Sequence, residues 1–549
     1  MGRFQRITSA LRSYTHTMEM KEERLRSLSE LARRLGIEKH AAKTYLSFTS
    51  AIRSQLKESL EELDFEEIST SEHEMTAFFP EFYSTDYRTT LHGIIAHGLN
   101  YRGVGSVFVF GDGSLGACKG NMSQYEDNCV RCVHQSNEFA ELMNIPDVFL
   151  DEINYDDSVK RDEIESKIED YAVSSTYRAL QIAEIDYENP EHVQLLEQFK
   201  RTGRIAWDVT DKLHKEYDFD YFVSTGSSYL PRGMALEYAK INDIPITASS
   251  DPIYGDGQDL MFSRLDGPLT HYISDKSWRI VEQRPLGSDQ ERELDEFMGE
   301  RMETVEQTQY ADSGESLELE EDTEMYSMYT HLPWDAAIRD VSRLFDDQYE
   351  WVRETVELFE TFDDKHLVIK VHPAEKMRGT EQSITDILDS TFDELPDNTT
   401  LLEPDTDVDP YELMRSSDIV LVYTSTVGME ATYLDTPVIT TADSHYAGKG
   451  FTYDPETKDE YRKLIDSGSS ELELDERMSS LVRKYLYNYF IQRPISFDLV
   501  LPNSYSSEES IIENLESIES LKPGGDAVLD DICKAIIENT SYFYTKTHQ

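Results

Sequence analysis

Short apolar runs that end abruptly in polar residues stand out along this chain. HLVIKV (366–371) and DIVLVY (418–423) are nearly continuous apolar runs, the pattern of strands that are buried on both faces of a parallel sheet. The first run ends at Pro373, which cannot continue a central strand, and the second meets Thr424 and then a helical run at 427–434. Open α/β sheets bind ligands outside the carboxyl ends of their strands, so we expect the chemistry there.

Strand and helix patterns alternate in two stretches of the chain, and strand, helix and strand at this spacing form parallel crossover units. The pattern predicts an α/β fold of two Rossmann-like, doubly wound domains. The expected strands are at 76–80, 106–114, 220–224, 245–249, 366–371, 399–404, 418–423 and 437–441, and the expected helices are at 89–103, 231–242, 339–362, 409–416, 427–434, 474–490, 507–518 and 527–540.

Length and composition favour two domains, because 549 residues exceed one core and a hydrophobic content of 39% is ample for two. The stretch between them is acid-rich, lacks an apolar run long enough for a core strand, and is interpreted as a linker. A helical, acidic insertion at 135–217 is assigned to no site. The predicted scheme is a basic helical extension (1–70), an N-terminal domain (71–285), an acidic linker (286–325), a C-terminal domain (326–500) and C-terminal helices (501–549).

The residues after the second strand have the chemistry to bind a phosphate. Unpaired backbone N–H groups of the turn and the hydroxyls of Ser425 or Thr426 can hold phosphate oxygens, and Gly428 would let a ligand approach closely. Glu430 follows Thr426 by one helical turn and could accept hydrogen bonds from ribose or sugar hydroxyls. Helix capping and a favourable charge on the helix dipole are the alternative explanation.

After the first strand, His372 can donate a hydrogen bond to a phosphate or a leaving group. A single histidine after a strand is more often structural, but Pro373, the neighbouring Lys370 and the matching second strand end favour a functional one.

These motifs, in the order IKVHPAE, SSDIVLVYTSTVGMEA, TPVI and HYAGKGF, resemble the C-terminal half of capsule polysaccharide biosynthesis proteins. Those proteins are glycosyltransferases with two Rossmann-like domains facing a cleft, the GT-B architecture. The HP motif and the serine/threonine motif recur in bacterial sialyltransferases, where they bind the donor nucleotide and its phosphate. The resemblance covers about 325–455 and, more weakly, 75–255. The donor-binding residues expected here are Lys370, His372, Pro373, Thr424, Ser425, Thr426, Gly428, Glu430, Tyr446 and Lys449.

The resemblance implies a cytoplasmic enzyme that moves a sugar from a nucleotide-activated donor to a surface-polysaccharide or lipid-linked glycan acceptor. The second domain would hold the donor, the first would hold the acceptor, and helices in 501–549 would cross back over the first. By its place at a strand end and by similarity to an acidic-Gly motif of sialyltransferases, Asp112 is the first choice of general base, and His92 is the second. Both could instead be capping or turn residues.

Catalysis is expected to need no cofactor, because His372, Lys370 and the turn after Ser425 could together neutralise a leaving phosphate. The letters Asp405-Thr406-Asp407 match a metal-binding pattern but lie in a loop without supporting context.

Three alternatives stay open. A polyol-phosphate transferase with a CDP-linked donor shares an HP and a serine motif. A sugar-nucleotide 2-epimerase has the same architecture, although its usual glutamate-rich pattern is not found after Gly428. A non-catalytic sugar-nucleotide-binding protein is the third.

The one cysteine cluster consists of Cys118, Cys129 and Cys132 with His134, spaced C-x10-C-x2-C-x-H. Three thiols and an imidazole are ligands that zinc selects in structural sites. Because the second C-x2-C pair of many zinc sites is missing, reduced cysteines without a metal are an equal alternative, and an iron–sulfur cluster is a weaker one.

The charge is extreme: 108 Asp and Glu face 52 Lys and Arg, giving −56, while the aromatic content of 11% is too high for a disordered acidic chain. A folded protein with this much surface acid resembles those of salt-accumulating halophiles, and we expect a halophilic archaeon as its source. The charge disfavours nucleic acid as a partner. Four cysteines, with neither a signal peptide nor an apolar run of about 18 residues, fit the cytoplasm.

Residues 1–57 break this pattern, with 12 Lys or Arg against five Glu, a net charge of +7. Leu25, Leu28, Leu31 and Leu35 lie at helical spacing, so we expect basic amphipathic helices. Such helices could rest on anionic lipid at the inner face of the membrane. They could instead form a hairpin that packs on the acidic body or joins two copies.

Charge alone yields a first testable prediction. Removing the +7 of residues 1–57 from −56 leaves −63 on the remainder. Dialysis from molar KCl into about 0.1 M salt lengthens the Debye length from roughly 3 to 10 Å. The folded structure, measured by circular dichroism, and the activity should therefore both decline at low salt. If residues 1–57 pack on the acidic body, a protein lacking them should be more salt-dependent, and equal stability at both salts would contradict the halophile hypothesis.

Overall fold

The computed structural model describes residues 51–52, 54–68, 73–122, 126–157, 162–226, 228–250, 259–264, 272–273, 275–309, 323–335, 341–378, 380, 382–500, 512 and 514–540. The expected basic helices before residue 51 and most of the expected helix at 507–518 lie outside these residues. The chain divides into two compact units. Unit 1 is Met1–Ser175, Asn189–Leu265 and Ile495–Tyr542, and unit 2 is Thr176–Glu188, Asp266–Pro494 and Phe543–Gln549.

Unit 1 is built on a seven-stranded sheet of order β12-β6-β5-β4-β1-β2-β3. The pairs among β1 to β5 are parallel, and β6 runs antiparallel to β5. The strands are β1 (Met75–Phe79), β2 (Val104–Phe110), β3 (Asp147–Phe149), β4 (Tyr221–Thr225), β5 (Ile246–Ser250), β6 (Asp259–Arg264) and β12 (Pro494–Ser496). Every residue of β2 is buried, as the apolar run at 107–110 predicts for a strand covered on both faces.

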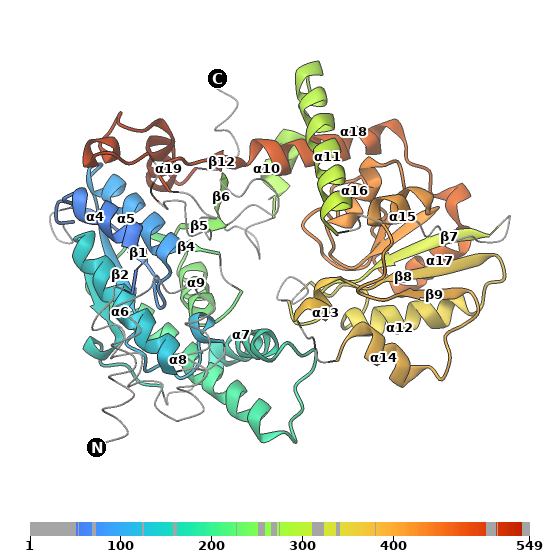
Figure 1. The fold of residues 1–549 in the computed structure, drawn as a ribbon, viewed down its shortest axis with the longest axis horizontal. Helices are drawn as coiled ribbons and strands as arrows, with labels where there is room; N and C mark the ends of the chain where they lie inside the picture. Colours follow the sequence, from blue (N-terminus) through green and yellow to red (C-terminus); the bar gives the residue numbers. More distant parts are fainter. Residues whose placement is uncertain are drawn as a thin grey trace, which may run out of the picture. The chain divides into compact units, whose positions relative to one another are not determined.

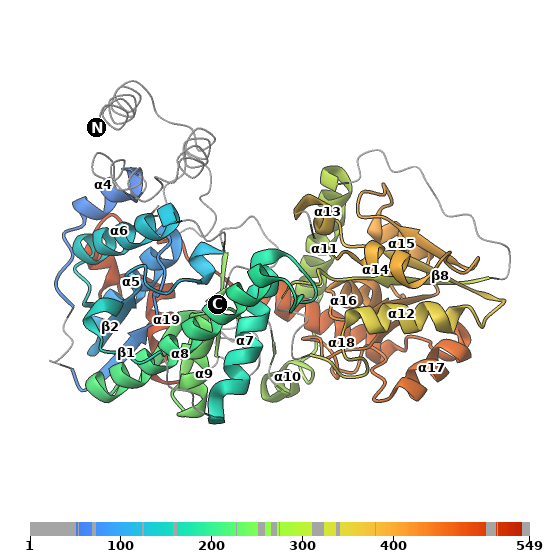
Figure 2. The same ribbon diagram turned by 90° about the horizontal axis from the view of Figure 1, so that it is seen from below.

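One face of this sheet carries α4 (Ser54–Glu62), α5 (Asp86–Asn100), α6 (Glu126–Leu142) and α19 (Ala527–Ile537), which share one core with β1 and β2. The helix α19 lies against α5 (Figure 1), where Gly98 leaves room for Cys533 and Leu529. The helices α8 (Pro190–Tyr217) and α9 (Arg232–Ile241) lie side by side (Figure 2). The helix α7 (Asp162–Leu180) precedes α8 in the chain.

Unit 2 contains a five-stranded, all-parallel sheet of order β11-β10-β7-β8-β9. Helices cover both faces, α12 and α14 on one side of β7, β8 and β9 and α15 and α16 on the other (Figure 1). The elements are β7 (Glu324–Tyr329), α12 (Gln348–Phe359), β8 (Lys365–Lys370), α13 (Ala374–Arg378), α14 (Ile384–Thr391), β9 (Thr399–Leu402), α15 (Pro410–Ser416), β10 (Ile419–Val422), α16 (Val427–Tyr433), β11 (Val438–Thr440), α17 (Lys458–Ser467) and α18 (Glu476–Leu486). The two sheets confirm the predicted α/β class with two Rossmann-like units.

The expected linker at 286–325 is wrong for most of its length. Residues Ser288–Gln309 form the helix α11, and the shorter α10 spans Asp275–Val281. Leu294 and Met298 of α11 are completely buried, and Met302 packs on the core of unit 2. A helix needs only an apolar stripe with four-residue spacing, so the absence of a continuous apolar run excluded a strand and not a packed helix.

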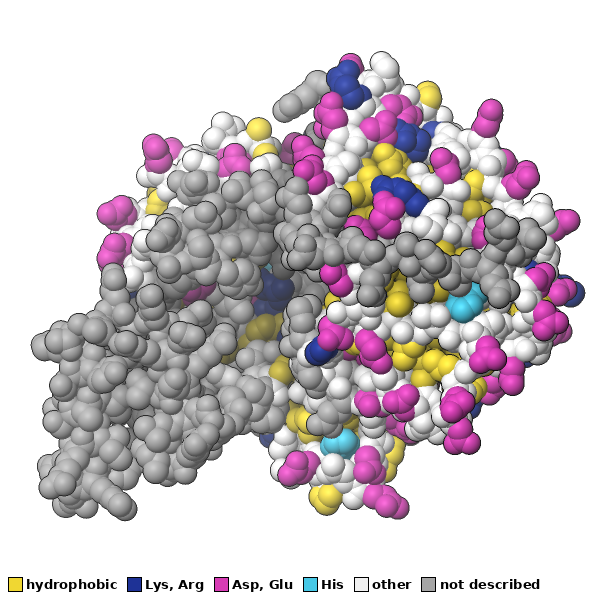
Figure 3. Space-filling model, turned by 45° about the vertical axis from the view of Figure 1, so that its right-hand side comes forward, with side chains coloured by type: hydrophobic (Ala, Val, Ile, Leu, Met, Phe, Trp, Pro, Cys, Tyr) yellow, Lys and Arg dark blue, Asp and Glu magenta, His cyan; other side chains and the backbone are white. Residues whose placement is uncertain are grey.

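The surface of the described residues is strongly acidic. On the face drawn in Figure 3, Asp and Glu side chains are spread widely and Lys and Arg are sparse. No helix in the described ranges combines the length and the apolarity needed to cross a membrane.

Candidate functional site

The register of the unit 2 sheet brings three strand ends to one level. Tyr329 of β7 pairs with Lys370 of β8 on one side and with Val422 of β10 on the other. The residues two positions further on are His331, His372 and Thr424. Because neighbouring strands lie about 4.8 Å apart, His372 and Thr424 are separated by roughly 10 Å of sheet, with His331 between them.

The strand order also reverses at this place. From β7 the chain proceeds outward through β8 and β9, and then returns to the other side of β7 with β10 and β11. At such a reversal the connections leave in opposite directions, and the crevice outside the strand ends can receive a ligand. The sequence therefore located the edge of the sheet correctly, although it did not indicate which strand lies at its centre.

His372 is partly exposed, and the turn that follows it fixes its tautomer. The N–H of Ala374 donates to His372 Nδ1 at 3.1 Å, so the ring proton of the neutral imidazole is on Nε2. Burial, followed by the charges of His331 and Lys370, lowers the pKa of His372 to about 4, while Asp335 acts in the opposite direction. At neutral pH this side chain is a neutral hydrogen-bond donor.

The Lys370 side chain does not point to the same position as that of His372. Its buried ammonium group donates to the carbonyl of Thr406 at 3.2 Å, on the sheet face that carries α15. Burial lowers the pKa of Lys370, and Asp405 and Asp407 oppose that effect. The two aspartates thus form the anionic surroundings of Lys370, and Asp405 also pairs with Lys376.

A buried tyrosine hydrogen-bonds to the backbone of the turn after β10. Tyr446 is completely buried, and its hydroxyl donates to the carbonyl of Ser425. A Cβ atom at Gly428 would collide with that hydroxyl, so the glycine makes room for Tyr446 and the expected close approach of a ligand is wrong. Ser425 and Thr426 remain partly exposed, whereas Thr424 is buried and its Oγ1 has no hydrogen-bond partner among the described residues.

Glu430 and Lys449 are occupied by other parts of unit 2. The Glu430 carboxylate is buried and accepts from Arg301 and from the Tyr411 hydroxyl, both at 2.8 Å. This contact joins α11, α15 and α16, so the structure gives Glu430 a structural role in place of the expected one toward a sugar. The ammonium group of Lys449 lies 2.8 Å from an Asp275 carboxylate oxygen.

In unit 1, Asp112 lies two residues past the end of β2 and is partly exposed. Its Oδ1 accepts from the backbone N–H of Ser114 at 2.9 Å and from the Ser114 hydroxyl at 2.6 Å. Gly113, with φ of 88°, permits the tight turn. Among the described residues, only Oδ1 of this carboxylate accepts hydrogen bonds, which leaves Oδ2 for a proton.

His92 belongs to a buried ionic network and is not an accessible base. Its Nδ1 lies 2.5 Å from Glu81 Oε1, and Arg232 donates to Glu81 Oε2 at 2.8 Å. Burial by itself would raise the pKa of Glu81, but Arg232 and His92 lower it to about 2. The His92 side chain has no exposed surface and cannot reach a bound acceptor, so the structure removes it from the candidate bases.

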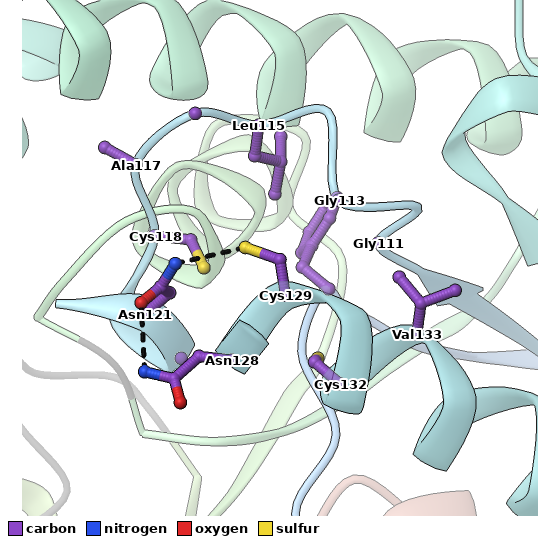
Figure 4. A pocket seen from close by; sticks show the side chains of 13 residues that line it. Gly111, Gly113, Leu115, Ala117, Cys118, Asn121, Asn128, Cys129, Cys132 and Val133 are labelled. Atoms are coloured by element: carbon purple, nitrogen blue, oxygen red, sulfur yellow. Dashed lines mark hydrogen bonds between the residues drawn. The ribbon is translucent and has the colours of Figure 1, made fainter. Parts of the chain in front are cut away.

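The cysteine cluster lines a pocket beside the turn of unit 1 that contains Asp112 (Figure 4). Cys118 comes from the loop after β2, and Cys129 and Cys132 come from one face of α6. The side-chain amide of Asn121 donates to Cys129 Sγ at 3.1 Å. Burial and the neighbouring cysteines raise the pKa of Cys118 to about 12, so its thiol is protonated at neutral pH.

The expected fourth ligand is not part of this pocket. His134 is exposed, because two residues along a helix turn its side chain about 200° away from that of Cys132. Within the described ranges, no group of three or more His, Cys, Asp or Glu side chains is arranged to hold a metal ion. Zinc binding by the three cysteines therefore stays a prediction, without His134.

Sequence reasoning did not single out His331, although a signal was present. His331-Leu332-Pro333 follows β7 much as His372-Pro373 follows β8. It also assigned no role to the insertion at 135–217, of which Thr176–Glu188 belongs to unit 2. There the Arg178 guanidinium stacks 4.4 Å from the centre of the Trp334 ring, and Gln382 Oε1 accepts from two backbone N–H groups of the segment.

The family model described as "Capsule polysaccharide biosynthesis protein" matches residues 289–488. The match begins in α11 and spans all five strands of unit 2. It covers 200 of the 549 residues, and this region of the chain is similar to capsule polysaccharide biosynthesis proteins. No curated protein matches the chain.

Several solved structures show weak similarity. KpsC of Thermosulfurimonas dismutans, a beta Kdo 2,7 transferase, has 17% identity over 55% of this chain and 86% of that chain, with a TM-score of 0.33. The beta Kdo 2,4 transferase of the same protein has 13% identity over 51% and 82%, with a TM-score of 0.33. A UDP-GlcNAc 2-epimerase from Neisseria meningitidis has 13% identity over 75% and 97%, with a TM-score of 0.23. Similarity at this level transfers no function to this chain.

Metal analysis tests the cysteine cluster. If it binds zinc, protein purified without chelators should contain about one equivalent, and Cys129→Ser should lower stability more than catalysis, because a structural metal stabilises the folded state. The matched control His134→Ala should leave the zinc content unchanged, since His134 is exposed. Protein that contains neither zinc nor iron would contradict the prediction.

Glu375, just after the HP motif, yields a prediction on pH. Burial raises its pKa to about 7, although the N–H of Ile384 donates to its carboxylate. Between pH 4.5 and 7 the unfolded state ionises first, so stability falls as pH rises through this window, by about 3 kcal/mol at most. Glu375→Gln should remove the loss and stabilise unit 2 at pH 8 in urea unfolding followed by tryptophan fluorescence. Exposed Glu394→Gln is the control, and an unchanged pH profile would show that Glu375 ionises normally.

Proposed function

We propose that this chain is a glycosyltransferase of GT-B architecture that moves a sugar from a nucleotide-activated donor to a surface-polysaccharide or lipid-linked glycan acceptor. The observation that carries the proposal is the alignment of His331, His372 and Thr424 where the strand order of unit 2 reverses. The same unit contains the region similar to capsule polysaccharide biosynthesis proteins.

His372 has the main role toward the donor. Its neutral Nε2–H can donate to an oxygen of the phosphate that leaves, and the partly exposed hydroxyls of Ser425 and Thr426 can add hydrogen bonds from β10. Lys370 contributes positive charge near the strand ends but makes no direct contact with the phosphate in this proposal, because its ammonium group donates to the Thr406 carbonyl. In this proposal, protein hydrogen bonds stabilise the leaving phosphate, and no metal cofactor is required.

The acceptor needs a general base, and we assign Asp112. In the transfer step, the bond between the donor sugar and its phosphate oxygen breaks while the acceptor hydroxyl oxygen bonds to the sugar carbon. The hydroxyl proton passes to Asp112, and the electron pair leaves with the nucleotide phosphate. The contacts of Ser114 to Oδ1 hold the carboxylate in one orientation.

His372→Ala and Ser425→Ala test the donor site. Each should lower turnover by roughly 10²-fold or more, because each removes a donor to the charge that develops on the leaving phosphate. Both side chains are partly exposed, so the fold should be retained. A thermal-shift screen of CMP-, UDP- and GDP-sugars in molar KCl identifies the donor, and mass spectrometry of the product measures the transfer.

The matched controls are His366→Ala, on β8 but bound to Thr400, and Ser390→Ala, on the exposed surface of α14. Both should retain wild-type turnover. Full activity in either site variant would remove that residue from the mechanism. Transfer of a polyol phosphate, or release of an epimerised sugar without an acceptor, would identify one of the alternative enzymes, and donor binding without turnover would identify a binding protein.

A further inference from the structure

We propose that His331 is a second phosphate-binding residue of this site and that, with His372, it holds the donor phosphate between two imidazoles. The inference rests on the proposed function, because it concerns the ligand of the same strand ends. It assigns a role to a residue outside the HP motif and the serine/threonine motif.

The geometry places the two rings next to each other. His331 and His372 are two residues past a paired position of β7 and β8, and their ring centres are 6.1 Å apart with an angle of 42° between the planes. Both side chains are partly exposed. At this spacing one phosphate oxygen can lie about 2.8 Å from a ring nitrogen of each imidazole and accept a hydrogen bond from both.

The backbone of His331 is held in place independently of its side chain. Gln348, at the start of α12, is buried; its Oε1 accepts from the N–H of His331 at 2.6 Å, and its Nε2 donates to the His331 carbonyl at 2.9 Å. These two hydrogen bonds position the His331 side chain at the edge of the sheet. They also mean that replacing the imidazole leaves the local fold intact.

The two rings differ in their tautomers. His331 Nδ1 is 3.4 Å from the Leu332 carbonyl, which can only accept, so a neutral His331 carries its proton on Nδ1 and leaves Nε2 as an acceptor. His372 has the opposite tautomer. A phosphate oxygen also accepts, so His331 can donate to it from Nε2 and keep its Nδ1 contact only by taking up a proton, whereas His372 donates without one.

The charges around the pair favour that uptake only when an anion is present. The charged groups that act on His372 are His331, Lys370 and Asp335, and the first two disfavour a second positive charge nearby. A phosphate supplies negative charge that offsets this repulsion. In the free protein the His372 ring therefore stays neutral at neutral pH, and a positive charge beside it becomes favourable when a ligand supplies negative charge.

Calorimetric titration with cytidine 5′-monophosphate, uridine 5′-diphosphate and guanosine 5′-diphosphate tests the proposal, in two buffers of different ionisation enthalpy at pH 7.5, where the phosphates are ionised. Comparing the buffers gives the number of protons taken up. We expect uptake by the wild type for the nucleotide that binds. His331→Gln, which can hydrogen-bond but cannot be protonated, should bind that nucleotide roughly tenfold to a hundredfold more weakly and with less uptake. His366→Ala should equal the wild type, and cytidine should respond to none of these changes.

The outcomes separate this proposal from the proposed function. In one outcome the wild type binds a nucleotide and His372→Ala lowers the affinity, but His331→Gln has unchanged affinity and proton uptake. The role of His331 is then refuted and the proposed function stands. If His331→Gln weakens cytidine as much as the nucleotide, its role is structural and the proposal fails. If no nucleotide binds the wild type, both are refuted. Circular dichroism of each variant confirms folding, and His331→Ala provides a second test of the same contact.

Discussion

The candidate site depends on the parallel register of three strands, β8, β7 and β10. In a parallel sheet all carboxyl ends lie at one edge, and the pairing of Tyr329 with both Lys370 and Val422 brings the next residues of three distant segments to the same level. A slip of one residue in any of these strands would exchange its two faces. All four residues of β10 and five of six residues in each of β7 and β8 are buried, so a slip would disturb the packing against helices on both faces.

Buried polar contacts then hold the turns beyond the strands. Gln348 fixes the backbone at His331, the Tyr446 hydroxyl fixes the carbonyl of Ser425, and Glu430 joins three helices through Arg301 and Tyr411. Each polar group is satisfied by the protein itself, which is the condition under which burying it is not costly. Four residues at this edge stay partly exposed: His331, His372, Ser425 and Thr426.

The local chemistry of this edge contrasts with the composition of the chain. A net charge of −56 repels a nucleotide phosphate at long range, and high salt would shorten that range. Binding therefore depends on contacts at short distance. A neutral His372 suits this situation, because it donates a hydrogen bond without the desolvation cost of a buried ammonium ion such as that of Lys370.

Hydrophobic periodicity alone determined the α/β class, most strands and the edge at which His372 and Ser425 lie, because continuous apolar runs and prolines are local signals. The sequence did not reveal the partner of His372, the burial of His92 and Glu430, or the use of Gly428 to admit Tyr446. It also mistook α11 for a linker. These features depend on contacts between segments far apart in the sequence, such as Glu81 with Arg232 at a separation of 151 residues. Local patterns carry no information about which distant group fills a given space, so only the tertiary structure decided them.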